Sequence, residues 1–135
     1  MNVIDTCVFI SAFYELDPKH KEARQILEKV IEGKIKAIIP TIALPEICGV
    51  IRRITGDIKF ASEVKKEIEE LISSGLLKVE ELTKTRMEEA SEIAIQLGVK
   101  GADAVFISLA KEFNANLITF DKEIKRKLEK SKMLG

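Results

Sequence analysis

The chain has 135 residues, a length that suits one domain with one hydrophobic core, so we expect residues 1–135 to form a single domain. Basic and acidic residues balance at 22 each, which excludes proteins that bind nucleic acid through an overall positive charge. Hydrophobic residues make up 46% of the chain, which excludes intrinsic disorder. No transmembrane segment or secretory signal is visible in the sequence, so we expect a cytoplasmic protein with no membrane contact.

Short apolar strands and amphipathic helices alternate along the sequence. The helices carry apolar residues at intervals of three and four, and Gly or Pro marks most of the boundaries. Asp17 and Asp57 are interpreted as helix N-caps. In chain order we predict a strand at 3–4, a helix at 6–13, a helix from Asp17-Pro18 to Gly33, a strand at 37–39, a helix capped by Thr41 and ended by Gly56, a helix from Asp57 to about 72, a strand at 76–79, a helix at 85–97, a helix at 101–113, a strand at 116–120 and a basic helix at 122–132.

This alternation indicates an α/β fold. Parallel strands need helical crossovers, so we predict a three-layer α/β/α sandwich with a parallel sheet of four to five strands. In such open sheets the ligand crevice lies outside the carboxyl ends of the strands. Residues that directly follow the strands are therefore the candidates for function.

Four acids occupy positions where a solvated side chain is not expected. Asp5 and Asp121 end the first and the fourth strand, and both follow apolar runs. Asp103 lies in the first turn of an apolar helix, and Glu46 is the only charge in a long apolar stretch. Taken singly, Asp5 and Asp103 also fit the N-terminal turn of a helix, where an acid is favoured. The joint pattern indicates a shared site.

Carboxylates that meet without basic partners raise one another's pKa, so a cation is the natural compensation. Oxygen ligands favour Mg²⁺ or Mn²⁺ over zinc. Such an ion can activate a water molecule and stabilise the charge that develops on a phosphodiester. The predicted reaction is metal-dependent phosphodiester hydrolysis.

Four segments in one order resemble the motifs of the PIN domain family. They are DTCVFI at 5–10, PEI at 45–47, ADAVFISLA at 102–110 and LITFD at 117–121. The resemblance covers the chain from Met1 to about Asp121. It implies a Mg²⁺- or Mn²⁺-dependent ribonuclease, an endonuclease that is often a VapC-like toxin neutralised by a small antitoxin, on a parallel sheet of strand order 3-2-1-4-5.

By position, the resemblance also implies the catalytic residues. Those that match the acidic quartet are Asp5, Glu46, Asp103 and Asp121. Asp5 and Asp103 are then the direct metal ligands, and the other two complete the site directly or through water. Thr6 and Thr119 match hydroxyl positions beside the quartet, and we expect Thr119 to orient Asp121 or a coordinated water.

The chain departs from the family pattern after the fourth acid. Family members often continue into a short edge strand, whereas here the charged segment 122–132 follows, so the fifth strand is expected to be absent or rudimentary. That absence favours an exposed sheet edge or a partner contact. The segment from 122 to the end holds six bases against two acids; an RNA backbone contact and a solvated helix face both stay open for it.

Two alternatives to a nuclease stay open. One is a PIN fold that binds RNA or protein without cleavage, and the other is an aspartyl-phosphate phosphatase or receiver module. The second fits poorly, because Cys7 stands where haloacid-dehalogenase-like phosphatases need a second Asp.

The expected partners are an RNA substrate, a small antitoxin and a second copy of the chain. Exposed apolar surface on the helix from Phe60 to Ile72 would support such a homodimer.

Cys7 and Cys48 are interpreted as reduced core cysteines, and His20 as an exposed residue.

Overall fold

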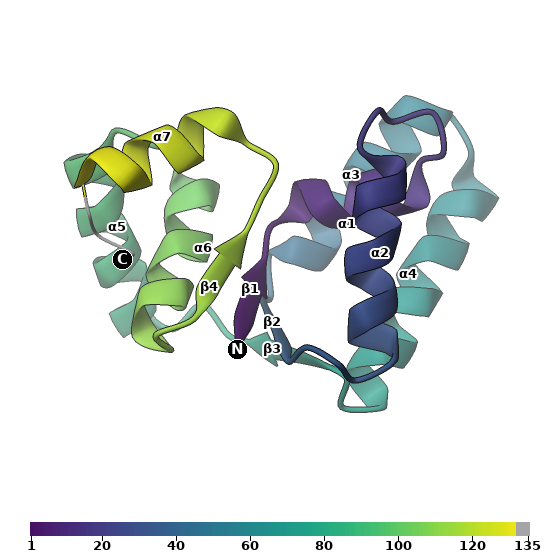
Figure 1. The fold of residues 1–135 in the computed structure, drawn as a ribbon, viewed down its shortest axis with the longest axis horizontal. Helices are drawn as coiled ribbons and strands as arrows, with labels where there is room; N and C mark the ends of the chain where they lie inside the picture. Colours follow the sequence, from purple (N-terminus) through teal and green to yellow (C-terminus); the bar gives the residue numbers. More distant parts are fainter. Residues whose placement is uncertain (132–135) are drawn as a thin grey trace.

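The computed structural model describes residues 1–131, which form a parallel sheet covered by helices (Figure 1). The elements in this part of the chain are β1 (Asn2–Ile4), α1 (Thr6–Phe13), α2 (His20–Ile31), β2 (Ala37–Pro40), α3 (Ala43–Thr55), α4 (Ile58–Ser73), β3 (Leu77–Glu80), α5 (Lys84–Leu97), α6 (Gly101–Glu112), β4 (Asn116–Ile118) and α7 (Lys122–Ser131). The position Lys132 of the predicted last helix lies outside the described residues.

All neighbouring strands run parallel, in the order β3-β2-β1-β4. Val3 on the central strand β1 lies opposite Ile38 on β2 and Leu117 on β4. The predicted α/β class and the strand order 3-2-1-4 are therefore confirmed. Residues 1–131 add no fifth strand after β4, as the charged segment indicated.

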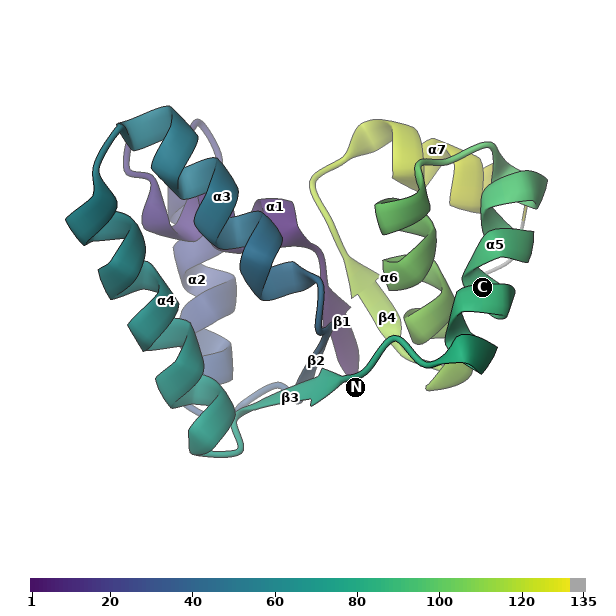
Figure 2. The ribbon, with the colours of Figure 1, turned by 180° about the vertical axis from the view of Figure 1, so that it is seen from behind.

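Two groups of helices cover the two faces of the sheet. Figures 1 and 2 show α1 to α4 on one side and α5 to α7 on the other. The helix α6 is buried on two sides: Phe106 and Leu109 join the main core with the sheet, and Ile107 packs with residues of α5 and α7, among them Ile124. This double burial explains why residues 104–110 are almost continuously apolar.

Some helix ends differ from the prediction. The helix α2 begins at His20, because the Asp17 side chain accepts the N–H of Lys19 in a preceding turn, at 2.8 Å, and does not cap the helix. Thr41 does not cap α3, which begins at Ala43 without a side-chain cap. The N-cap at Asp57 is confirmed, since its carboxylate accepts the N–H of Phe60 at 2.9 Å.

The expected free apolar face of α4 is not present. Val64 and Ile68 are buried, and the half-buried Phe60, Leu71 and Ile72 pack against the main core. The homodimer prediction therefore loses the surface on which it depended.

Within residues 1–131 no single helix is long and apolar enough to cross a membrane. The helices α5 and α6 reach the necessary length and apolar character only together, across a bend of 110°.

Candidate functional site

The predicted site lies at the carboxyl ends of the central strands, between the two groups of helices (Figure 1). Asp5 follows β1 directly, and its backbone N–H donates to the carbonyl of Ile118 at the end of β4, at 2.9 Å. Glu46 and Asp103 come from the first turns of α3 and α6. Asp121 precedes α7. Four separate segments thus supply the four acids.

Asp5 is buried and fully engaged in hydrogen bonds. Its Oδ1 accepts the backbone N–H of Thr6 at 2.8 Å, which caps α1. Its Oδ2 accepts the hydroxyl of Thr119 at 2.7 Å and the thiol of Cys7 at 3.5 Å. Within residues 1–131 no basic side chain pairs with this carboxylate. The capping and the functional interpretation of Asp5 are therefore compatible.

Thr119 connects two of the acids. Its hydroxyl donates to the Asp5 carboxylate and accepts the backbone N–H of Asp121 at 3.0 Å. We expected Thr119 to orient Asp121 or a coordinated water; its hydroxyl contacts Asp121 through the backbone N–H, and it also holds the side chain of Asp5.

The Asp121 side chain is exposed, so its predicted enclosure is wrong. One carboxylate oxygen accepts the N–H groups of Glu123 and Ile124, at 2.9 and 3.1 Å. These contacts cap the N-terminus of α7, where a negative charge is stabilised by the helix dipole. Only the second oxygen of Asp121 stays available toward the site.

A hydrogen bond between α1 and α3 holds Glu46. The buried Thr6 donates its hydroxyl to Glu46 Oε1 at 3.0 Å. Glu46 is half-buried, and Oε2 has no hydrogen-bond partner within the described residues. Thr6 thus lies beside the quartet, as the motif predicted, and fixes one of its members.

The electrostatics of Asp103 show that the four acids share one environment. Burial is the main cause that raises the pKa of the Asp103 carboxyl above its ordinary value. The negative charges of Asp5, Asp121 and Glu46 raise it further, and only Lys100 acts in the opposite direction. The three other carboxylates therefore oppose the ionisation of Asp103, as expected for acids that share one environment.

The four carboxylates lie in one region, but they do not surround one common position. Among residues 1–131 no three His, Cys, Asp or Glu side chains are close enough together to hold one metal ion. The donor chemistry nevertheless fits a hard divalent cation, since every donor is a carboxylate oxygen and the charges repel one another.

Cys7 belongs to the site, although the sequence placed it only in the core. Besides Asp5, its sulfur lies 3.7 Å from the hydroxyl of Thr119. Burial, followed by the nearby charge of Asp5, raises the pKa of the Cys7 thiol to about 11, so it remains a protonated donor at neutral pH. In the sequence, the one sign that Cys7 lies near the acids is its position two residues after Asp5, at the start of the same helix.

The other residues considered from the sequence lie elsewhere. Cys48 is a free, half-buried cysteine on α3, beside Arg52 and Lys65. His20 is half-buried rather than exposed, and its Nδ1 lies 2.8 Å from the carbonyl oxygen of Ser11. Neither contributes to the group of acids.

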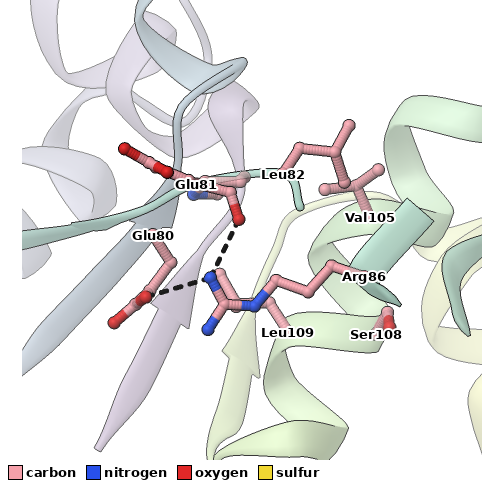
Figure 3. Close-up of a pocket in the computed structure, with 8 residues that line it drawn as sticks. Glu80, Glu81, Leu82, Arg86, Val105, Ser108 and Leu109 are labelled. Carbon is pink, nitrogen blue, oxygen red and sulfur yellow. Dashed lines mark hydrogen bonds and ion pairs between the residues drawn. The ribbon is translucent and has the colours of Figure 1, made fainter. Parts of the chain in front are cut away.

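A small hollow between the end of β3 and α6 is closed by Arg86 (Figure 3). Its guanidinium reaches Glu80 at 3.0 Å and the carbonyl of Glu81 at 2.8 Å, and it forms two hydrogen bonds to Glu112 at 2.9 and 2.8 Å. No predicted site residue lines this hollow. We interpret the arginine as a structural clamp.

Comparisons with known proteins agree with the fold. The model of the PIN domain family matches residues 3–129. No curated protein sequence shows significant similarity to the chain.

Several solved structures share the fold. VapC20 of Mycobacterium tuberculosis, described as a sarcin-ricin loop cleaving toxin, superposes with a TM-score of 0.77 at 18% identity, over 93% of this chain and 94% of that one. A toxin-antitoxin complex from Klebsiella pneumoniae gives 0.65 at 17% identity, over 90% and 87% of the two chains. VapBC2 of Rickettsia felis, bound to a DNA fragment from its promoter, gives 0.65 at 16% identity, over 93% and 91%. At these identities the likeness concerns the fold.

Proposed function

Because the chain belongs to the PIN domain family, we propose that it is a ribonuclease that hydrolyses RNA phosphodiester bonds with Mg²⁺ or Mn²⁺. The catalytic residues of this proposal are Asp5, Glu46, Asp103 and Asp121, supported by Thr6 and Thr119. The observation that carries it is that three carboxylates, those of Asp5, Glu46 and Asp121, act on the half-buried Asp103, with Lys100 as the one opposing charge. Membership of this family also removes the aspartyl-phosphate alternatives.

The side chains suit the roles that this chemistry requires. Asp103 accepts no hydrogen bond within residues 1–131, so its carboxylate is available to a cation together with Asp5. Glu46 and Asp121 each keep one oxygen for the ion or for its waters. When bound, a divalent ion activates a water molecule and stabilises the developing phosphate charge. Thr6 and Thr119 hold Glu46 and Asp5 in place.

We further propose that the chain is the toxin of a toxin-antitoxin pair, and that a small antitoxin protein is its partner. The support is that solved structures with this fold include a toxin and two complexes whose descriptions name a toxin-antitoxin assembly or VapBC2. Co-purification of a small protein encoded beside this chain, together with loss of cleavage in the complex, would test the pairing. A neighbouring protein that neither binds nor inhibits would contradict it.

A non-catalytic PIN module that binds RNA or protein is the second candidate. Two observations favour it: Asp121 already caps α7, and within residues 1–131 the acids do not surround a common point. A nuclease needs these acids to draw together when the ion binds, whereas a binding module does not.

Cleavage of RNA by the purified protein, freed of any bound antitoxin, decides between the two. We expect a labelled single-stranded RNA to be cut with Mg²⁺ or Mn²⁺ and to stay intact with EDTA. Asp103→Asn and Asp5→Asn should each reduce the rate by about a hundredfold or more, since even an outer-shell partner of a metal typically contributes 10- to 100-fold. Glu89→Gln, at an exposed position of α5, is the matched control and should cleave normally.

An intact RNA under all conditions would overturn the nuclease in favour of the binding module. Undiminished cleavage by Asp103→Asn would instead leave a nuclease and refute the site assignment.

A further inference from the structure

The helix α7 starts at the candidate site and leads away from it. Asp121, its capping residue, belongs to the acidic group, and the helix then crosses over α5 and α6 (Figure 1). Ile124 and Leu128 are its buried residues and pack with residues of those two helices. The opposite face of α7 is exposed and rich in lysine and arginine.

Two of the five described bases on α7 are already neutralised. Arg126 pairs with Glu123 at 2.6 Å, and Lys127 lies 3.6 Å from the same carboxylate. Lys127 also donates to the carbonyl of Gly98, at 2.7 Å, and so fastens α7 to the end of α5. Arg126 and Lys127 are therefore occupied by contacts within the chain.

Lys122 and Lys125 differ from that pair. Both are exposed, and neither has an ion-pair partner within residues 1–131. The backbone N–H of Lys125 donates to the carbonyl of Asp121 at 3.1 Å, so Lys125 lies one turn beyond Asp121 on the same side of the helix. Lys127, two residues further, projects from roughly the opposite side. Two positive charges without an ion-pair partner among residues 1–131 thus follow Asp121 within the first turn of α7.

A substrate backbone is negative, and the four carboxylates alone would repel it. Lysines beside the site offset that repulsion and bind phosphates with release of counterions. The helix offers no aromatic ring on which an RNA base could stack, because α7 has no aromatic residue. The ring of the nearby Phe120 is half-buried, and Lys19 lies over it at 5.8 Å. A contact at this place therefore reads phosphates and not bases.

We propose that the first turn of α7 is an RNA-backbone site, in which Lys122 and Lys125 bind phosphates of a single strand next to the catalytic acids. This inference rests on the proposed ribonuclease function. The exposed Lys130 is not part of this site, because it lines a hollow together with Arg126 and Lys127, on another side of the helix.

Binding without cleavage tests the proposal. The affinity of the full chain for a fluorescein-labelled single-stranded RNA is measured by fluorescence anisotropy in EDTA, over a series of salt concentrations. The variant K122Q/K125Q is compared with K59Q/K66Q, which removes the same charge from exposed lysines of α4. Circular dichroism establishes that both variants are folded.

We expect K122Q/K125Q to bind about tenfold more weakly at low salt, and its slope of log affinity against log salt to fall by about 1.4, because each phosphate contact to a single strand contributes roughly 0.7. The control should retain the wild-type affinity. A loss below about threefold, or an equal loss in the control, overturns the proposal and leaves this face to an acidic protein partner. Cleavage by the wild-type protein with Mn²⁺ is scored separately, so failure of the nuclease and failure of the α7 site are distinguishable.

Discussion

Asp5 serves the fold and the candidate site through different oxygens. Its Oδ1 caps α1, while Oδ2 receives the Thr119 hydroxyl and the Cys7 thiol. Asp121 has a similar double position, because it caps α7 and acts electrostatically on Asp103. Substitution by Asn keeps an acceptor for the cap while it removes the charge, so Asn is the informative replacement at both positions.

Thr119→Val should slow RNA cleavage by about 10- to 100-fold, the range typical for residues that orient a metal ligand. The substitution removes the donor to Asp5 Oδ2 and the acceptor for the Asp121 N–H. Thr119→Ser keeps the hydroxyl and should restore most of the rate. A Val variant that cleaves RNA as fast as the Ser variant would contradict a role for the hydroxyl.

Asp103→Asn should stabilise the metal-free protein at pH 7, even though it removes activity. The pKa of Asp103 is raised in the folded state, mainly by burial, so the folded protein binds the proton more tightly than the unfolded chain. Stability therefore falls as the pH rises through the folded-state pKa, and at pH 7 the ionised Asp103 opposes folding.

Urea unfolding of Asp103→Asn and wild type, in EDTA, measures this effect at pH 7 and at about pH 4. The increase in the free energy of unfolding caused by Asp103→Asn should be present at pH 7 and should become smaller at about pH 4. A variant that is less stable than wild type at pH 7 would contradict the assigned cause of the pKa shift.

Arg86 joins three elements at the edge of the sheet that lies on the β3 side. It contacts Glu80 at the end of β3 (Figure 3). From the start of α5 it also reaches Glu112 at the end of α6, and its guanidinium lies 5.9 Å from the ring of Phe113. The start of α5 otherwise depends on its N-cap Thr83, whose hydroxyl accepts the N–H of Arg86. The clamp sets how the pair α5 and α6, which carries Asp103, meets the sheet.

Arg86→Lys should lower the free energy of unfolding by about 1 kcal/mol, because lysine keeps the charge and loses the two-pronged hydrogen bond to Glu112. Arg126→Lys is the matched control: Arg126 pairs with Glu123 on an exposed helix face, so its replacement should change stability much less. Urea unfolding compares the two, and equal losses would exclude a clamp.

Element order and most boundaries could be predicted from local signals. Gly56 and Gly98 end helices in the left-handed conformation, and Asp57 begins one, as their positions in the sequence indicated. The wrong caps have a common cause: near Asp17 and Thr41 the chain makes a turn before the helix, and a capping residue type does not say whether its helix starts at once.

At the scale of the whole molecule, the acids could be found from the sequence because parallel strands bring their carboxyl ends together. What could not be found depends on contacts between distant segments. The thiol of Cys7 lies beside the hydroxyl of Thr119, 112 positions away in the sequence, and the apolar face of α4 packs into the main core, against α3 and β3. Neither fact leaves a periodic signal in the sequence.

The zero net charge also has a different meaning in the structure. Three of the 22 acids act on a fourth, Asp103, while Lys122 and Lys125 have no ion-pair partner within residues 1–131. An overall neutral chain can therefore carry an acidic centre with a basic border. This arrangement suits a cation and a polyanion at neighbouring places.

The central claim, that the four acids form one divalent-metal site, is tested most directly by calorimetric titration of Mn²⁺ into the purified, EDTA-treated and desalted protein. Wild type and Glu89→Gln should show the same saturable binding, and Asp103→Asn should bind at least about tenfold more weakly, since it removes a direct ligand. No saturable binding to wild type, or the same affinity in Asp103→Asn, would contradict the account.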